Sequence, residues 1–71
     1  MDASLFRYHM DRNGDTQGTL AEALGLSQSG LSNRINGHVS FRQNEMNMIR
    51  ERYHLSADDI QRIFFAGTIS K

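Results

Sequence analysis

Residues 17–35 read QGTLAEALGLSQSGLSNRI, and this stretch decides the fold. Its apolar residues recur at helical spacing on either side of Gly25, so it predicts two short helices, at 17–24 and 28–36, joined by a tight turn. Glycine suits this turn because the residue that ends a helix often needs a positive φ, which side chains with a Cβ disfavour. The stretch therefore predicts a helix, a glycine turn and a second helix.

The second of these helices presents an almost uncharged outward face. Leu31 and Ile35 are four residues apart and are expected to face the core, which turns the amides and hydroxyls of the helix outward. Solvated helix faces are usually rich in lysine and glutamate, whereas amides and hydroxyls both donate and accept hydrogen bonds, as reading base edges requires. The candidate base-reading residues are Gln28, Ser29, Ser32 and Asn33. A small helix with polar contacts to solvent is the alternative, and the residues alone leave both open.

The remaining sequence predicts an all-α fold of five helices in one domain. The chain has no proline, and no stretch alternates polar and apolar residues for long. Turn signals divide it into helices at about 3–13, 17–24, 28–36, 41–53 and 57–66, followed by a tail at 67–71. The predicted N-caps include Thr16, Ser27 and Ser56, and Ser40 with Gln43 fits a capping box before the fourth helix.

Length and composition limit the possible functions. The 71 residues can form one modest core, and no cysteine is present, which excludes a thiolate zinc site and a disulfide scaffold. The longest apolar run has four residues and no apolar stretch follows the start, so we expect no membrane span, no secretory signal and a cytoplasmic protein. The three histidines lie far apart, and no serine has a histidine and an acid in a recognisable motif. The expectation is no metal, no cofactor and no enzyme.

Charge is unevenly distributed, although eight basic and eight acidic residues give a net charge of zero. Residues 31–54 hold four arginines and two glutamates, a net of +2, whereas residues 1–30 hold two arginines and four acids, a net of −2. Arg42 lies at a predicted helix start, where the dipole disfavours a cation, so a bound phosphate would explain it. An ion pair with Glu45 is the alternative. Helix 41–53 contains two other arginines, Arg50 and Arg52. We expect both to be solvated or paired with neighbours of Glu51.

The two-helix unit resembles the lambda-repressor-like helix-turn-helix domains of phage Cro proteins and repressors. The resemblance extends from about Leu5 to Phe65. The residues of the two-helix unit that fall on the family pattern are Gln17, Leu20, Ala21, Leu24, Gly25, Leu26, Ser27, Leu31 and Ile35. It implies a stand-alone transcriptional regulator that binds operator DNA, usually as a homodimer, in the cytoplasm of a bacterial host.

The resemblance also implies roles for matching residues. Like the pattern of the outward face, the resemblance implies that base edges are contacted by Gln28, Ser29, Ser32 and Asn33. It assigns a backbone phosphate to Gln17, which would also brace Gln28, and another to Asn36 with the loop that follows. The positive segment completes the candidate phosphate contacts with Arg34, His38 and Arg42.

The sequence departs from the family pattern at three positions. Asp15 stands where an apolar residue usually packs the first helix on the second, and Met10 replaces a usual basic residue. Gly18 lies near the start of helix 17–24, where it lowers helix propensity by about 1 kcal/mol relative to alanine in a helix interior. The departures bear on stability and on charge and leave the recognition unit unchanged.

The C-terminal segment suggests a protein contact. Phe64, Phe65 and Ile69 would leave an apolar patch if they were exposed together, so we expect a homodimer or partner contact there. The alternative is that Phe65 completes the core of the monomer. The patch and the zero net charge keep a second function open, a phage anti-repressor or co-repressor that acts by contact with a larger repressor.

Overall fold

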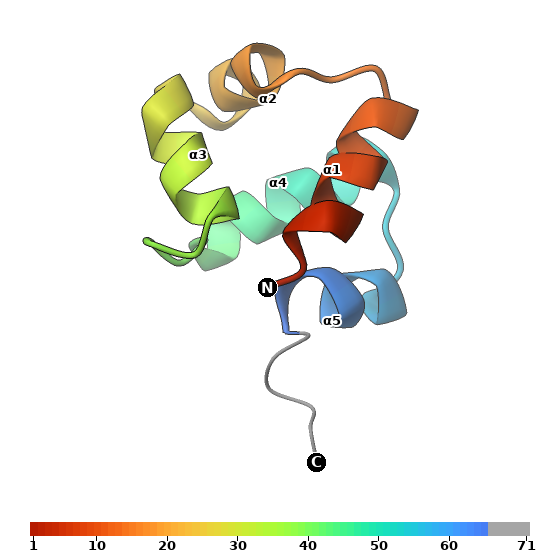
Figure 1. Ribbon diagram of the computed structural model, residues 1–71. Helices are drawn as coiled ribbons and strands as arrows, with labels where there is room; N and C mark the ends of the chain where they lie inside the picture. The colour runs from red at the N-terminus through yellow and green to blue at the C-terminus, as the bar shows by residue number, and fades with distance from the viewer. Residues whose placement is uncertain (66–71) are drawn as a thin grey trace.

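The structure, a computed structural model, describes residues 1–65 and shows them as an all-helical fold without strands (Figure 1). Its five helices are α1 (Ala3–Arg12), α2 (Gln17–Leu24), α3 (Gln28–Ile35), α4 (Gln43–Tyr53) and α5 (Ala57–Phe64). The prediction of an all-α fold with five helices is confirmed for this part of the chain. The predicted tail at 67–71, including Ile69, lies outside the described residues.

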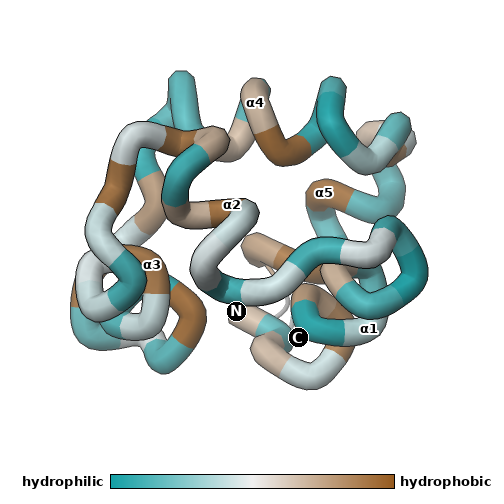
Figure 2. The backbone as a smooth tube through the Cα atoms, turned by 90° about the horizontal axis from the view of Figure 1, so that it is seen from above, coloured by the Kyte–Doolittle hydropathy of each residue, from teal (hydrophilic) through white to brown (hydrophobic). Residues whose placement is uncertain are grey.

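The helices form two neighbouring pairs that α4 connects. α2 contacts α3, and α1 contacts α5 (Figure 1). The start of the chain is tied to α5 because the backbone N–H of Asp2 donates to the carbonyl oxygen of Ile63 at 2.8 Å. Seen from above, α3 and α1 lie at opposite sides of the domain (Figure 2). α3 therefore lies at one side of the domain.

The core forms where apolar residues of all five helices meet. Its largest fully buried side chains are Phe6, Leu20, Leu31, Ile35, Ile49 and Ile63. In α3, Leu31 is 0% and Ile35 1% exposed, as the i, i+4 spacing predicts. Burying each of these side chains stabilises the fold by about 1.5–3 kcal/mol. The pair therefore determines which face of α3 is turned away from the core.

A tight glycine turn joins α2 to α3. Gly25 has φ +73°, in the left-handed region that favours glycine, as predicted. The N–H of Leu26 donates to the carbonyl oxygen of Ala21 at 2.8 Å, which satisfies an acceptor that the helix end leaves unpaired. Ser27 then caps the start of α3, with its Oγ accepting from the N–H of Gly30 at 3.0 Å. The two helices are thus held in a defined relation by local bonds.

The start of α4 differs from the prediction. The helix begins at Gln43 with Arg42 as its N-cap residue, so the predicted start at 41 and the cap at Ser40 are wrong. The reason is packing. The ring of Phe41 packs against that of Phe6, with centroids 5.6 Å apart, and the backbone is still extended at Arg42 before the helix begins. Thr16, Ser27 and Ser56 do cap their helices as predicted. None of the helices in residues 1–65 has the length and apolar character to cross a membrane.

Candidate nucleic-acid interface

The outward face of α3 carries the four predicted base-reading residues. Gln28, Ser29 and Asn33 are exposed, and Ser32 is half-buried. The Nδ2 of Asn36 donates to the Oγ of Ser32 at 3.3 Å, which extends the polar row beyond the last turn of the helix. Because the helix is anchored from behind, these amides and hydroxyls face solvent together. They form one row of hydrogen-bond donors and acceptors, which we call the α3 face.

Gln28 lies over the first turn of α2. A Cβ placed on Gly18 would come within 3.3 Å of Nε2 of Gln28 and 3.6 Å of its Cδ. Gly18 thus makes room for the Gln28 side chain. The absence of a side chain at this position lets the amide of Gln28 rest close to the α2 backbone.

Gly18→Ala tests this contact. We expect the free energy of unfolding to rise by about 0.5 kcal/mol, because alanine favours a helix over glycine by up to about 1 kcal/mol and the end of Gln28 is flexible enough to move. The side-chain amide resonances of Gln28 should shift in NMR spectra. Ala23→Gly, at an exposed position of the same helix, is the control and should lower stability by about 1 kcal/mol. A loss of stability in Gly18→Ala would show that Gln28 is held rigidly.

A buried carboxylate links α3 to α4. The Oε1 of Glu45 accepts from Nε of Arg34 at 2.9 Å and from the backbone N–H of Arg42 at 2.9 Å. The Nη1 of Arg34 also donates to the carbonyl oxygen of Gly30 at 3.0 Å. Burial raises the pKa of Glu45, but the bonds from Arg42 and Arg34 outweigh burial and leave the pKa below its usual value. Arg34, a predicted phosphate contact, is thus turned toward the body of the domain.

The exposed cations near α3 are fewer than the charge count suggests. Arg42 is exposed at the start of α4, and Glu45 accepts from its backbone N–H rather than from its guanidinium. Asn36 and His38 are exposed in the segment that joins α3 to α4, and Gln17 is half-buried at the start of α2. Of the five predicted phosphate contacts, Asn36, His38 and Arg42 are thus exposed, Gln17 is half-buried, and Arg34 is turned inward.

Asp15 is the center of a second buried network, which the sequence reasoning missed. Nε and Nη2 of Arg52 donate to Oδ2 and Oδ1 of Asp15 at 2.7 and 2.8 Å. The hydroxyls of Tyr53 and Thr19 donate to the same carboxylate at 2.7 and 2.8 Å. The expectation that Arg52 is solvated or paired with neighbours of Glu51 is wrong, because Asp15 reaches it from across the fold. The only signal in the sequence was an acid at a position where the helix-turn-helix domains that it resembles usually have an apolar residue.

The network explains how an acid replaces an apolar contact between helices. The hydrogen bond from Arg52 lowers the pKa of Asp15 far below its usual range, with burial opposing the shift and the bonds from Tyr53 and Thr19 adding to it. Burial, followed by the bond to the Asp15 carboxylate, raises the pKa of Tyr53. Asp15 is therefore ionised at neutral pH and joins the start of α2 to the end of α4.

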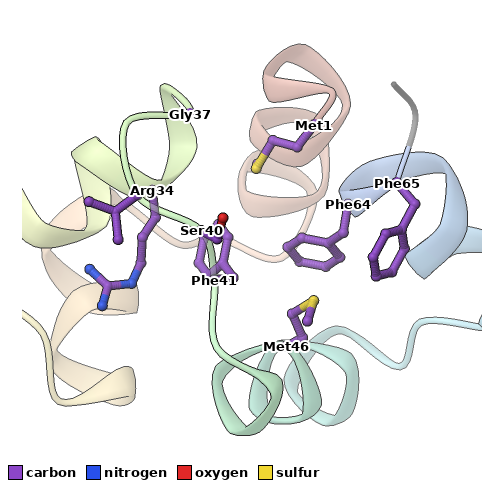
Figure 3. Close-up of a pocket in the computed structure, with 9 residues that line it drawn as sticks. Met1, Arg34, Gly37, Ser40, Phe41, Met46, Phe64 and Phe65 are labelled. Atoms are coloured by element: carbon purple, nitrogen blue, oxygen red, sulfur yellow. The ribbon is translucent and has the colours of Figure 1, made fainter. Parts of the chain in front are cut away.

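The C-terminal phenylalanines divide between core and surface. Phe64 is half-buried and packs against Phe41 and Phe6, with ring centroids 5.3 and 6.0 Å apart. Phe65 is exposed and lines a groove of about 230 Å³ together with Met46 and Phe41 (Figure 3). Phe64 thus packs against the core of its own chain. Of the residues predicted to form a homodimer or partner contact, Phe65 is exposed.

A family model described as "Protein of unknown function (DUF739)" matches residues 6–67. The chain belongs to this family. No curated protein and no solved structure matches the sequence. The match to DUF739 begins within α1 and continues past the end of α5, so it includes the α3 face and both buried carboxylates.

Over residues 1–65 the structure brings together no group of three histidine, aspartate or glutamate side chains that could hold a metal ion. His9 and His54 line one polar pocket with Asp59, whose pKa is lowered by hydrogen bonds from Ser56. The clustered polar groups of the α3 face are therefore the strongest candidate site.

Proposed function

We propose that the chain is a sequence-specific DNA-binding transcriptional regulator of the phage Cro and repressor type, which occupies an operator with α3 in the major groove. The observation that supports it best is the α3 face itself, an exposed row of uncharged donors and acceptors. Leu31 and Ile35 hold this row outward from behind. Solvent-exposed helix faces are usually rich in charged residues, whereas uncharged donors and acceptors of this kind read base edges.

The geometry of α3 suits a major groove. With its side chains an α-helix is about 10–12 Å in diameter, which fits a major groove about 12 Å wide. Residues at the start of such a helix contact base edges, and Gln28 and Ser29 occupy the first two positions of α3. The amides of Gln28 and Asn33 can pair with both N6 and N7 of adenine. Ser29 and Ser32 can donate to or accept from several bases.

The flanking residues would hold the backbone. Arg42 and His38 lie in the segment after α3, and a phosphate there would also meet free N–H groups at the start of α4. Gln17 and Asn36 would contact phosphates at either end of the α3 face. In a homodimer the two copies of α3 would lie about 34 Å apart, one turn of DNA.

Substitution of the amides tests the proposal. On a duplex that the protein enriches from random DNA, Gln28→Ala or Asn33→Ala should weaken binding by about 1–3 kcal/mol, because a base edge loses its partner. Binding to random duplexes should change little. Gln61→Ala in α5 and Asn47→Ala in α4 remove exposed amides away from α3 and serve as matched controls. Equal losses on enriched and random DNA, measured by fluorescence anisotropy, would argue against base reading by α3.

The groove beside Phe65 favours a second candidate, a co-repressor or anti-repressor that binds a larger phage repressor. Its lining includes the exposed side chains of Val39 and Phe65, which suit an apolar partner. Salt dependence separates the candidates. A DNA regulator loses affinity steeply as salt rises, because phosphate contacts release counterions, whereas an apolar protein contact does not.

A further inference from the structure

Arg34 is the only ionised side chain of α3, and the structure turns it away from solvent. The α3 sequence QSGLSNRI contains no other acid or base. The Arg34 side chain is 11% exposed, and that of Glu45, its partner 2.9 Å away, is 5% exposed. Arg34 also reaches back one turn to the carbonyl oxygen of Gly30. The guanidinium is thus held at two of its nitrogens, by one neighbouring helix and by its own helix.

This arrangement has an electrostatic consequence for the α3 face. Arginine contacts to phosphate add affinity that is independent of sequence, while base-edge contacts carry the sequence information. An arginine near the end of a helix in the major groove could reach the DNA backbone with its long side chain. Because Glu45 pairs with Arg34 inside the domain, the guanidinium does not reach a DNA phosphate. α3 then meets DNA through neutral groups alone.

We propose that Glu45 determines specificity through Arg34: it keeps the guanidinium from DNA phosphates, so that base contacts make up a larger share of the binding energy of α3. This inference rests on the proposed DNA-binding function and names a role for a residue that lies behind the α3 face. Glu45 itself contacts no DNA and is a positioning residue. Its second bond, to the N–H of Arg42, fixes it at the start of α4.

Glu45→Gln tests the role by releasing Arg34. The amide carries no charge, so the attraction that holds the guanidinium inside the domain is lost, and we expect Arg34 to turn to solvent, where it can contact a phosphate. The dissociation constant for a random-sequence duplex is measured from 50 to 200 mM salt. The slope of log affinity against log salt should become steeper by about 0.9, the value for one added phosphate contact. Random-duplex affinity should rise several-fold at low salt, and the ratio of specific to random affinity should fall.

Three further variants isolate the cause. Glu51→Gln makes the same change of charge at an exposed position of α4 and should leave the slope unchanged. Arg34→Gln, which keeps Glu45 in place, should also leave the slope of the wild-type protein unchanged, because Arg34 is already withheld. The double variant Arg34→Gln, Glu45→Gln removes both charges together, so it leaves no unpaired carboxylate, and it should also keep the wild-type slope.

The outcomes separate this proposal from the function on which it rests. A wild-type protein that binds no DNA at any salt concentration overturns the proposed function. A wild-type protein that binds DNA, together with an unchanged slope in folded Glu45→Gln, overturns the role of Glu45 alone. A slope that becomes shallower by about 0.9 in Arg34→Gln does the same, since it would show that Arg34 already contacts a phosphate.

Discussion

Asp15→Ala should lower the free energy of unfolding by about 3 kcal/mol, because removal of one partner from a buried ion pair costs about 3–5 kcal/mol. The value lies at the lower end because Arg52, with its side chain 40% exposed, can turn its charge to water. The hydroxyls of Tyr53 and Thr19 lose their acceptor as well. Urea denaturation at pH 7 measures the loss. Asp11→Ala, at an exposed acid of α1, is the control and should change stability by less than about 0.5 kcal/mol.

The same carboxylate makes stability depend on pH. Its pKa in the folded protein lies below its unfolded value of about 3.9, so its contribution is complete above the unfolded pKa and is lost as pH falls through the folded pKa. The stability of wild type should therefore fall faster than that of Asp15→Asn as the pH drops from 5 toward 2. Parallel curves for the two proteins would show that Asp15 does not carry this dependence.

Leu31→Ala should lower the free energy of unfolding by about 3 kcal/mol, within the range for removing a fully buried leucine from a core. Ser29→Ala, two residues away on the exposed side of α3, should change it by less than about 0.5 kcal/mol. The comparison uses thermal and urea denaturation of both variants. A small loss in Leu31→Ala, or an equal loss in Ser29→Ala, would mean that α3 is rolled differently and that the α3 face is misassigned.

The α2–α3 unit could be predicted from sequence because its determinants are local. Thr16, Gly25 and Ser27 each act within a few residues of their own position, through a cap or a left-handed backbone. The spacing of Leu31 and Ile35 then predicts the roll of α3 without knowledge of what they pack against. Exposure of the amides and hydroxyls follows from the same spacing.

Features that depend on distant partners could not be predicted. α4 begins two residues later than expected because Phe41 joins the rings of Phe6 and Phe64 from other helices. The partner of Arg52 is Asp15, separated from it by 37 positions, and a helical pattern carries no sign of such a pair.

In the candidate site, too, the locally determined features could be predicted and those that depend on distant partners could not. The outward position of the α3 face is a matter of periodicity, and it was predicted. The position of Arg34 depends on Glu45, eleven residues away on another helix, so charge counting alone assigned this arginine to phosphate. The structure shows that two of the four arginines in residues 31–54 have buried acids as partners.

Selection from a pool of random DNA duplexes, with the purified protein alone, tests the central claim most directly. The account predicts an enriched motif, with two half-sites about 34 Å apart if the protein binds as a dimer. It also predicts that a Gln28→Ala, Asn33→Ala double variant loses preference at defined bases of that motif. A pool that remains random after repeated rounds, with a folded protein, would contradict the claim that α3 reads DNA.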